Sequence, residues 1–214
     1  MNTRLQVEHP VTELVTGIDL VEQMILSADN KKLAIRQEDI KLNGWSVESR
    51  IYAEDPTKDF LPSIGRVTRY IEPKKIEKDY EVIRNDTGIS PGSEVSLYYD
   101  PMISKLAVHS KDRISAINLM INSLQNYYLS GLENNIDFLM RDCIKNIMVA
   151  DVPIGAFLSG GIDSSIVVSI MQSLSSNKIK TYTLGFQESE YDESIYAKRI
   201  ANFLNSKFIF FLCA

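Results

Sequence analysis

A glycine turn between an apolar run and a helical pattern constrains this chain more than any other feature. Residues 154–158 are apolar, the turn SGGIDS of residues 159–164 follows at once, and helix-patterned residues come next. The start of a helix presents unpaired backbone N–H groups, and glycines let an anion approach the main chain closely. The order of strand, glycine turn and helix therefore predicts an α/β unit with a phosphate-binding loop.

The turn lacks the lysine of a Walker A loop, so oxyanions would be bound by backbone amides and by the hydroxyls of Ser159 and Ser164. A carboxylate beside a phosphate is repulsive unless a divalent cation lies between them, which makes Asp163 a candidate Mg²⁺ ligand. The plainer alternative is a strand-to-helix turn in which Asp163 caps a helix that begins at Ser164. The six residues alone leave both interpretations open.

Around this turn, the pattern predicts helices over residues 164–174 and 192–204 and strands over residues 179–186 and 207–212. The resulting β-α-β-α-β order is typical of a parallel sheet with right-handed crossovers. The last strand is apolar on both faces and is expected to form an exposed edge that promotes aggregation.

The amino-acid sequence of this segment resembles that of a known family. SGGIDSS, with ADVPIGAFL before it and KTYTLGF after it, resembles the pyrophosphate-binding loop of the N-type ATP pyrophosphatases, specifically the synthetase domain of asparagine synthetase. The resemblance implies ATP and Mg²⁺ as ligands, with Asp163 on the metal and two residues of the following strand beside adenine. The implied nucleotide-binding residues are Ser159, Gly160, Gly161, Asp163, Ser164, Leu184 and Gly185.

The composition is that of a soluble, folded protein, with 44% hydrophobic and 24% charged residues. A net charge of -5 argues against a nucleic-acid-binding surface. The two cysteines, Cys143 and Cys213, suggest neither a disulfide framework nor a zinc site, which favours the reducing cytoplasm. The sequence shows no apolar run of membrane-spanning length and no signal-peptide core, so no membrane association is expected.

The first ten residues alternate in polarity, which predicts a strand over Met1–Pro10. Arg4 can grip a carboxylate-like anion with two bonds, and Glu8 is an acceptor and possible base on the same face. Alternation alone favours a solvated edge strand in which the two charges merely pair. A strand is also predicted over residues 46–53, where Glu48 and Arg50 form either a site-facing charge pair or a plain surface pair.

A second resemblance covers this part of the chain. MNTRLQVEHPVTE is similar to the end of the ATP-grasp domain of biotin carboxylase, and ESRIYAEDP, FLPSIGRVTRY, YYDPMISKL and GLENNIDFL are similar to its C-terminal domain. The match to the α subunits of propionyl- and acetyl-CoA carboxylases runs from Met1 to about Leu139. Ser130 departs from the arginine that is often found before the following glycine.

The second resemblance implies roles for particular residues. Glu8 would be the general base, and Arg50 would stabilise the enolate of biotin, because a developing oxyanion gains most from a cation already in place. Asn2 would lie beside a metal site, and Asp100 near the biotin pocket or a subunit contact. Bicarbonate would be held by the side chains of Arg4, Gln6 and Glu8 and the backbone of Val7.

The remaining pattern completes a two-part prediction. A core-packing helix is expected over residues 16–28, short strands over 64–71, 80–85 and 93–99, and a helix capped by Asp112 over the resulting antiparallel sheet. The fold class is thus α+β, an antiparallel sheet with covering helices, followed by a truncated α/β parallel-sheet unit. The expected domains are the end of an ATP-grasp domain (1–28), a biotin carboxylase C-terminal domain (29–139) and a partial asparagine synthetase domain (140–214).

Three functions follow as hypotheses. The first is a fragment of the biotin carboxylase of an acyl-CoA carboxylase, which carboxylates biotin with ATP and bicarbonate, fused to the partial synthetase domain. The second is an asparagine synthase-type ATP pyrophosphatase that adenylates aspartate. The third is a noncatalytic module for dimerisation and biotin docking. Expected partners are biotin carboxyl carrier and carboxyltransferase subunits and a second copy of the chain. Neither full reaction is expected from these residues alone, since the glycine-rich lid and most ATP-grasp ligands would precede Met1.

Overall fold

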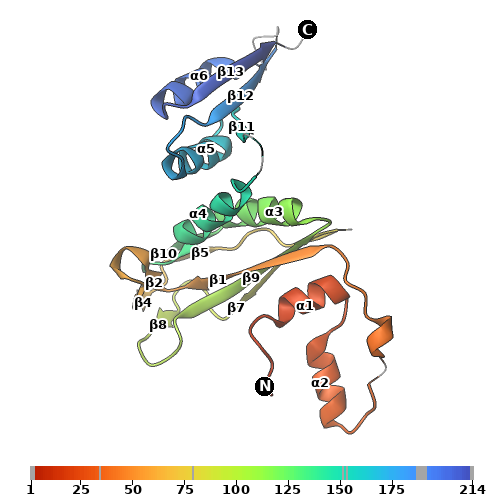
Figure 1. The fold of residues 1–214 in the computed structure, drawn as a ribbon. Coiled ribbons are helices and arrows are strands. Elements are labelled where there is room, and N and C mark those ends of the chain that lie inside the picture. Colours follow the sequence, from red (N-terminus) through yellow and green to blue (C-terminus); the bar gives the residue numbers. More distant parts are fainter. Residues whose placement is uncertain are drawn as a thin grey trace. The chain divides into compact units, whose positions relative to one another are not determined.

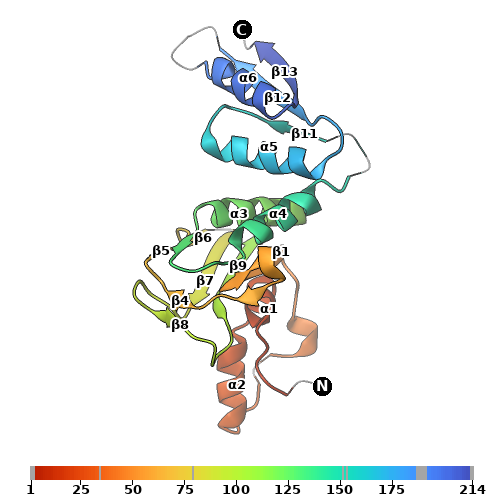
Figure 2. The ribbon, with the colours of Figure 1, turned by 90° about the vertical axis from the view of Figure 1, so that its left-hand side faces the viewer.

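The structure is a computed structural model that describes residues 3–33, 35–78, 80–150, 152, 154–186 and 192–212. The chain divides into two compact units, Met1–Met140 and Arg141–Ala214 (Figures 1 and 2). The division falls inside helix α4 (Ile136–Ile147). None of the described helices is both long enough and apolar enough to cross a membrane.

A four-stranded antiparallel sheet is the centre of the first unit. Its order is β1 (Trp45–Tyr52), β9 (Met102–Ser110), β7 (Glu81–Thr87) and β6 (Ile76–Lys78). The strands predicted over residues 46–53 and 80–85 are observed. The longest strand, β9, has no counterpart in the prediction, because nearly all of its residues are buried and it therefore lacks the polar alternation of a half-exposed strand.

Helices cover both faces of this sheet. Helix α1 (His9–Thr16) packs on one face of β1 and β9, and α3 (Arg113–Gln125) packs on the other (Figures 1 and 2). Asp112 caps α3 as predicted, since its carboxylate accepts a hydrogen bond of 2.8 Å from the Ser115 backbone N–H. Because side chains alternate along a strand, β1 presents Glu48 and Arg50 toward α1 while Ile51 enters the core beneath α3.

The N-terminal prediction is wrong in two respects. Residues 3–8 form no strand; α1 begins directly at His9, with Pro10 in its first turn, and ends at Gly17, which is left-handed. Helix α2 (Leu20–Ala28) starts after Asp19, whose carboxylate accepts a hydrogen bond from the Glu22 N–H, as the sequence indicates. Its apolar face is not core, however: no residue of α2 is buried, and Ile25 is 64% exposed.

Short pairs of strands complete the first unit. The strand predicted over residues 64–71 is divided into two short strands, and the one predicted over residues 93–99 is shorter because Tyr98 and Tyr99 lie in an exposed turn. The short elements are η1 (Gln37–Asp39), β2 (Glu54–Asp55), η2 (Pro56–Lys58), β3 (Leu61–Pro62), β4 (Gly65–Arg66), β5 (Arg69–Ile71), β8 (Glu94–Val95) and β10 (Tyr128–Ser130). They pair as β2 with β3, β4 with β8 and β5 with β10.

The second unit is a three-stranded parallel sheet with two helices. Strands β11 (Gly155–Phe157), β12 (Lys180–Gly185) and β13 (Lys207–Leu212) are adjacent in that order, and α5 (Ile162–Leu174) and α6 (Ser194–Phe203) connect them. The predicted order of elements and parallel pairing are thus observed. A small core lies between helices and sheet, formed by Leu158, Val168, Ala197 and Ala201. The last three residues of β13, Phe210, Phe211 and Leu212, are exposed. The predicted tendency of this strand to promote aggregation stays a prediction.

Candidate functional site

Arg50 joins two carboxylates on the α1 side of the sheet. Its Nη2 donates a hydrogen bond to the carboxylate of Glu8, the residue just before α1, and its Nε donates to Oε1 of Glu48 at 3.4 Å. Glu8 is more than half exposed, whereas the Glu48 side chain is only 7% exposed. The predicted base and the predicted enolate-stabilising cation are therefore brought together, although 42 positions separate them in the sequence.

The two carboxylates have opposite electrostatic character. The pKa of Glu8 is lowered, first by its own backbone N–H and further by the hydrogen bond and charge of Arg50. The pKa of Glu48 is raised, because burial disfavours its charged form more than Arg50 and Lys105 favour it. Glu8 is thus the stronger acid, and Glu48 retains a proton to a higher pH.

A cavity of about 600 Å³ opens beside this charged group. It lies between the start of α1, the outer half of β1 and the first residues of α4, all within the first unit. Its size is within the range of small-molecule sites. It is lined by Glu8, Val11, Thr12, Glu48, Ser49, Arg50, Tyr52, Asn135 and Leu139.

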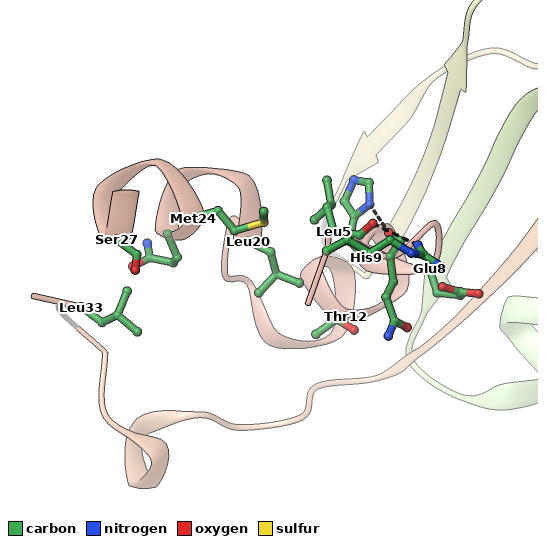
Figure 3. A pocket seen from close by; sticks show the side chains of 11 residues that line it. Leu5, Glu8, His9, Thr12, Leu20, Met24, Ser27 and Leu33 are labelled. Carbon is green, nitrogen blue, oxygen red and sulfur yellow. Dashed lines mark hydrogen bonds between the residues drawn. The ribbon is translucent and has the colours of Figure 1, made fainter. Parts of the chain in front are cut away.

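A second cavity, of about 420 Å³, lies between the N-terminal segment and α2 (Figure 3). Leu20 and Met24 of α2 and Leu33 form its apolar wall, and the His9 ring bonds back to the Gln6 carbonyl at 2.8 Å. Of the residues predicted to hold bicarbonate, Arg4 and Gln6 line this cavity and not the one beside Arg50. Glu8 lines both cavities and is the residue at which they meet.

The other predicted site residues of the first unit are more distant from Arg50. The Val7 carbonyl accepts a long hydrogen bond of 3.5 Å from Lys105 Nζ, which ties the N-terminal segment to β9. Asp100 accepts a bond of 2.8 Å from the Met102 N–H in a turn and lines neither cavity. Asn2 lies outside the described residues.

Sequence reasoning missed the network that holds α1 on the sheet. Arg84 Nη1 donates to Glu13 at 2.6 Å, and its Nε and Nη2 donate to Asp86 at 2.8 and 2.9 Å. The other oxygen of Glu13 accepts a bond from the Leu20 N–H, so the same carboxylate also fixes the start of α2. No local spacing indicates this network, because Glu13 and Arg84 lie 71 positions apart.

Asn135 is a second residue of the site that the sequence analysis did not identify, although it lies in the GLENNIDFL motif. It is buried, its Oδ1 accepts a bond of 2.9 Å from the Tyr52 N–H, and its Nδ2 donates to the Arg50 carbonyl at 3.0 Å. These bonds replace a strand partner where β1 ends. Asn135 therefore fixes the backbone of Arg50 itself.

In the second unit, the predicted loop gathers hydroxyls and backbone amides at the start of α5. Ser159 Oγ lies 3.0 Å from Ser164 Oγ and accepts a bond from the Gly161 N–H at 3.3 Å. Helix α5 begins at Ile162 after Gly161, and no side chain caps it. The alternative in which Asp163 caps a helix from Ser164 is therefore wrong, and Asp163 lies in the first turn.

Two glycines of this unit allow close packing. Gly160 has a φ of +90°, and a Cβ there would lie 2.8 Å from Cβ of Tyr196, so the loop needs glycine to rest against α6. A Cβ on Gly185 would lie 2.4 Å from the Phe210 ring. Leu184 and Ser159 line a cavity of about 220 Å³, whereas Gly185 does not. Across the part of the chain that the structure describes, no three His, Cys, Asp or Glu side chains gather as a metal site.

Comparisons with known proteins find family models that match three segments of the chain. Residues 48–152 match the family model of the biotin carboxylase C-terminal domain, and residues 1–36 match that of the ATP binding domain of the carbamoyl-phosphate synthase L chain. A third match, over residues 135–212, is to the family model of asparagine synthase.

Individual relatives agree with the first of these matches. The mitochondrial propionyl-CoA carboxylase alpha chains of Caenorhabditis elegans and Homo sapiens are 52% and 53% identical over 146 and 147 residues, which is 68% of this chain and 20% of each relative. The biotin carboxylase domain of a thermophilic 2-oxoglutarate carboxylase, solved with ADP, is 43% identical with a TM-score of 0.63, over 66% of this chain and 30% of that one. The chain thus spans about a fifth of the length of these curated relatives. The part of the chain that carries Glu8 and Arg50 is therefore similar to the biotin carboxylase part of propionyl-CoA carboxylase alpha chains.

Proposed function

We propose that the first unit contributes the bicarbonate- and biotin-facing part of a biotin carboxylase that serves an acyl-CoA carboxylase. The observation that carries this proposal is the Glu8–Arg50 pair at the edge of an open cavity of about 600 Å³. The similarity to propionyl-CoA carboxylase alpha chains supports an acyl-CoA carboxylase as the parent enzyme. Biotin would then arrive on a carboxyl carrier and deliver its carboxyl group to a carboxyltransferase subunit, and a homodimer is the proposed assembly.

The two cavities that meet at Glu8 suggest separate binding sites for the two substrates. Arg4 and Gln6 would bind bicarbonate in the cavity beside α2, and Arg50 would face biotin in the other. Glu8 reaches both, and its carboxylate is ionised at neutral pH, so it can accept the proton of bicarbonate as a general base. ATP, when bound, supplies the phosphoryl group that activates bicarbonate.

Arg50 would act on biotin as a fixed cation. Its guanidinium is already held by Glu8 and Glu48, so little reorganisation is needed when negative charge develops on the ureido oxygen of biotin. The roles proposed for Asn2 beside a metal and for Asp100 near biotin stay predictions.

Binding of biotin should depend on Arg50. We expect NMR titration of the ¹⁵N-labelled chain with free biotin, in bicarbonate buffer at pH 8, to shift the signals around Glu8 and Arg50. Arg50→Ala should weaken binding by at least about tenfold, since a hydrogen bond from a charged donor contributes roughly 1.5–3 kcal/mol. The control is Arg36→Ala, which removes an exposed arginine paired only with nearby acids. Equal affinity in the two variants would contradict the proposal.

The second unit supports a separate candidate function, nucleotide binding of the ATP pyrophosphatase kind. The support is the match of residues 135–212 to asparagine synthase together with the loop at the start of α5. Backbone N–H groups at a helix start and serine hydroxyls suit phosphate oxyanions, and a carboxylate in the first turn suits Mg²⁺. The proposed ligands of ATP and Mg²⁺ are Ser159, Gly160, Gly161, Asp163 and Ser164, with Leu184 and Gly185 beside adenine.

Asp163 tests this candidate. We expect the chain to bind ATP more tightly with Mg²⁺ than with EDTA, and Asp163→Ala to remove that difference, as measured by isothermal titration calorimetry. Asp142→Ala, which changes an exposed aspartate of the same unit, should leave the difference in place. Binding that is insensitive to Mg²⁺ in the unmodified chain, or an Asp163 variant that behaves like the control, would rule the assignment out.

A further inference from the structure

Two arginines on the same face of the sheet are held in different ways. Arg84 donates Nε and Nη2 to the two oxygens of one carboxylate, that of Asp86, at 2.8 and 2.9 Å. Arg50 divides the same two nitrogens between two carboxylates, with Nε on Glu48 and Nη2 on Glu8. A forked pair with one carboxylate fixes a guanidinium in one geometry. The Nε and Nη2 groups of Arg84 are therefore held by one carboxylate, while its Nη1 bonds to Glu13; in Arg50 the Nε and Nη2 groups are divided between two carboxylates.

Glu48 has an unused acceptor at this point. Its side chain is 7% exposed, and its Oε2 is buried without a hydrogen-bond partner among the described residues. A buried carboxylate oxygen without a partner is costly. Its Oε1 already accepts from Arg50, so a small rotation of the guanidinium would bring Nη2 from Glu8 to Oε2 and produce the forked geometry that Arg84 shows.

We propose that Glu48 is the positioning residue for Arg50: it anchors Nε permanently and accepts Nη2 on Oε2 whenever Glu8 is engaged with a substrate proton. The proposal rests on the proposed function in assigning Glu8 a proton-accepting role. A base that takes up a proton loses the charge that attracts Arg50, and the contacts that then hold this partly buried arginine are Glu48, which is the charged one, and the Tyr52 side chain. Glu48 keeps the cation in position through that step.

The surrounding charges are consistent with this role. Arg50 and Lys105 are directly opposite each other on β1 and β9, and Asp86 is opposite Lys105 on β7, so these charges share one face of the sheet with Arg84. Glu8 and Glu13 face them from the α1 side, and Arg84 lies next to Asp86 on β7. The acidic members are Glu8, Glu13, Glu48 and Asp86, and the basic members are Arg50, Arg84 and Lys105.

The exchange of the arginine Nε–H with water tests the proposal without any ligand. In the full chain, ¹⁵N NMR can follow Arg50 and Arg84 together, so that Arg84 serves as an internal reference. We expect Glu48→Met to accelerate exchange at Arg50 by about tenfold or more, through loss of a charge-assisted bond, and Glu8→Met to change it by less than about twofold. Exchange at Arg84 should stay the same in both variants. An unchanged Arg50 rate in Glu48→Met, or equal acceleration in the two variants, would overturn the proposal.

A pH series on the unmodified chain provides a second test should Glu48→Met fail to fold. Burial raises the pKa of Glu48 while that of Glu8 is lowered, so Glu48 loses its charge first as the pH falls. Exchange at Arg50 relative to Arg84 should therefore rise as the pH approaches and passes the titration of Glu48, before Glu8 titrates. A ratio that stays constant until Glu8 titrates would contradict the role of Glu48. Failure of the biotin titration would instead count against the proposed function, because neither exchange measurement uses biotin.

Discussion

Replacement of Leu106 by alanine is expected to lower the free energy of unfolding of the first unit by about 2–5 kcal/mol. Leu106 is 0% exposed and lies in the middle of β9, between β1 and β7, on the side of the sheet that faces α3. The change removes buried methyl groups and leaves a cavity that strands paired on both sides cannot collapse to fill. A loss of this size is a large fraction of the stability of a typical domain.

Urea unfolding followed by Trp45 fluorescence measures this loss in the correct unit. Trp45 is the only tryptophan of the chain and lies in β1, which pairs directly with β9. The matched control is Leu97→Ala, which removes the same atoms from a side chain that is 67% exposed and should change stability by no more than about 0.5 kcal/mol. Similar losses in the two variants would show that β9 is not the centre of the core.

Elements with a clear period could be predicted from the sequence. The alternation of β1, the Asp112 cap of α3 and the strand-turn-helix order of the second unit are all local signals, and the structure contains each of them. Strand β9 carries no such signal, since burial on both faces removes the polar alternation that marks a half-exposed strand.

The N-terminal errors have a different origin. Residues 3–8 alternate in polarity without pairing to any strand, and Pro10 starts a helix that the alternation does not indicate. Helix α2 has a regular apolar face, but an amphipathic pattern states only that a face can be buried, and not that this part of the chain buries it. Whether residues 3–8 pair as a strand and whether the apolar face of α2 is buried both depend on tertiary contacts, which the local pattern does not contain.

The candidate site could be predicted in part. Glu8 and Arg50 follow from the resemblance to biotin carboxylase, and Glu48 from the alternation of β1, whose charge pair turns out to face a cavity. Asn135 and the Glu13–Arg84 contact could not be found in this way, because both depend on residues that only the tertiary fold brings together. Likewise, only the structure shows that Arg4 and Arg50 line different cavities with Glu8 between them.

In a carboxylase that carries residues 3–140 of this chain, loss of the Arg50 side chain is expected to reduce biotin carboxylation by at least about a hundredfold. Removal of one preorganised donor from a developing oxyanion typically lowers the rate by about 10²–10³. Arg50→Lys should restore little, because the single nitrogen of an ammonium group cannot reproduce the planar arrangement in which Nη2 meets Glu8 and Nε meets Glu48. Arg36→Ala, at an exposed surface pair, should retain full activity.

The most direct measurement of the central claim is fixation of ¹⁴C-bicarbonate by a chimeric carboxylase. Residues 3–140 of this chain would replace the matching segment of the human propionyl-CoA carboxylase alpha chain, which is 53% identical over 147 residues. If Glu8 and Arg50 form a working biotin carboxylase centre, the chimera will fix label in a biotin-dependent manner, and Arg50→Ala will abolish fixation. A folded, ATP-binding chimera that fixes no label, or one whose activity survives Arg50→Ala, would contradict the account.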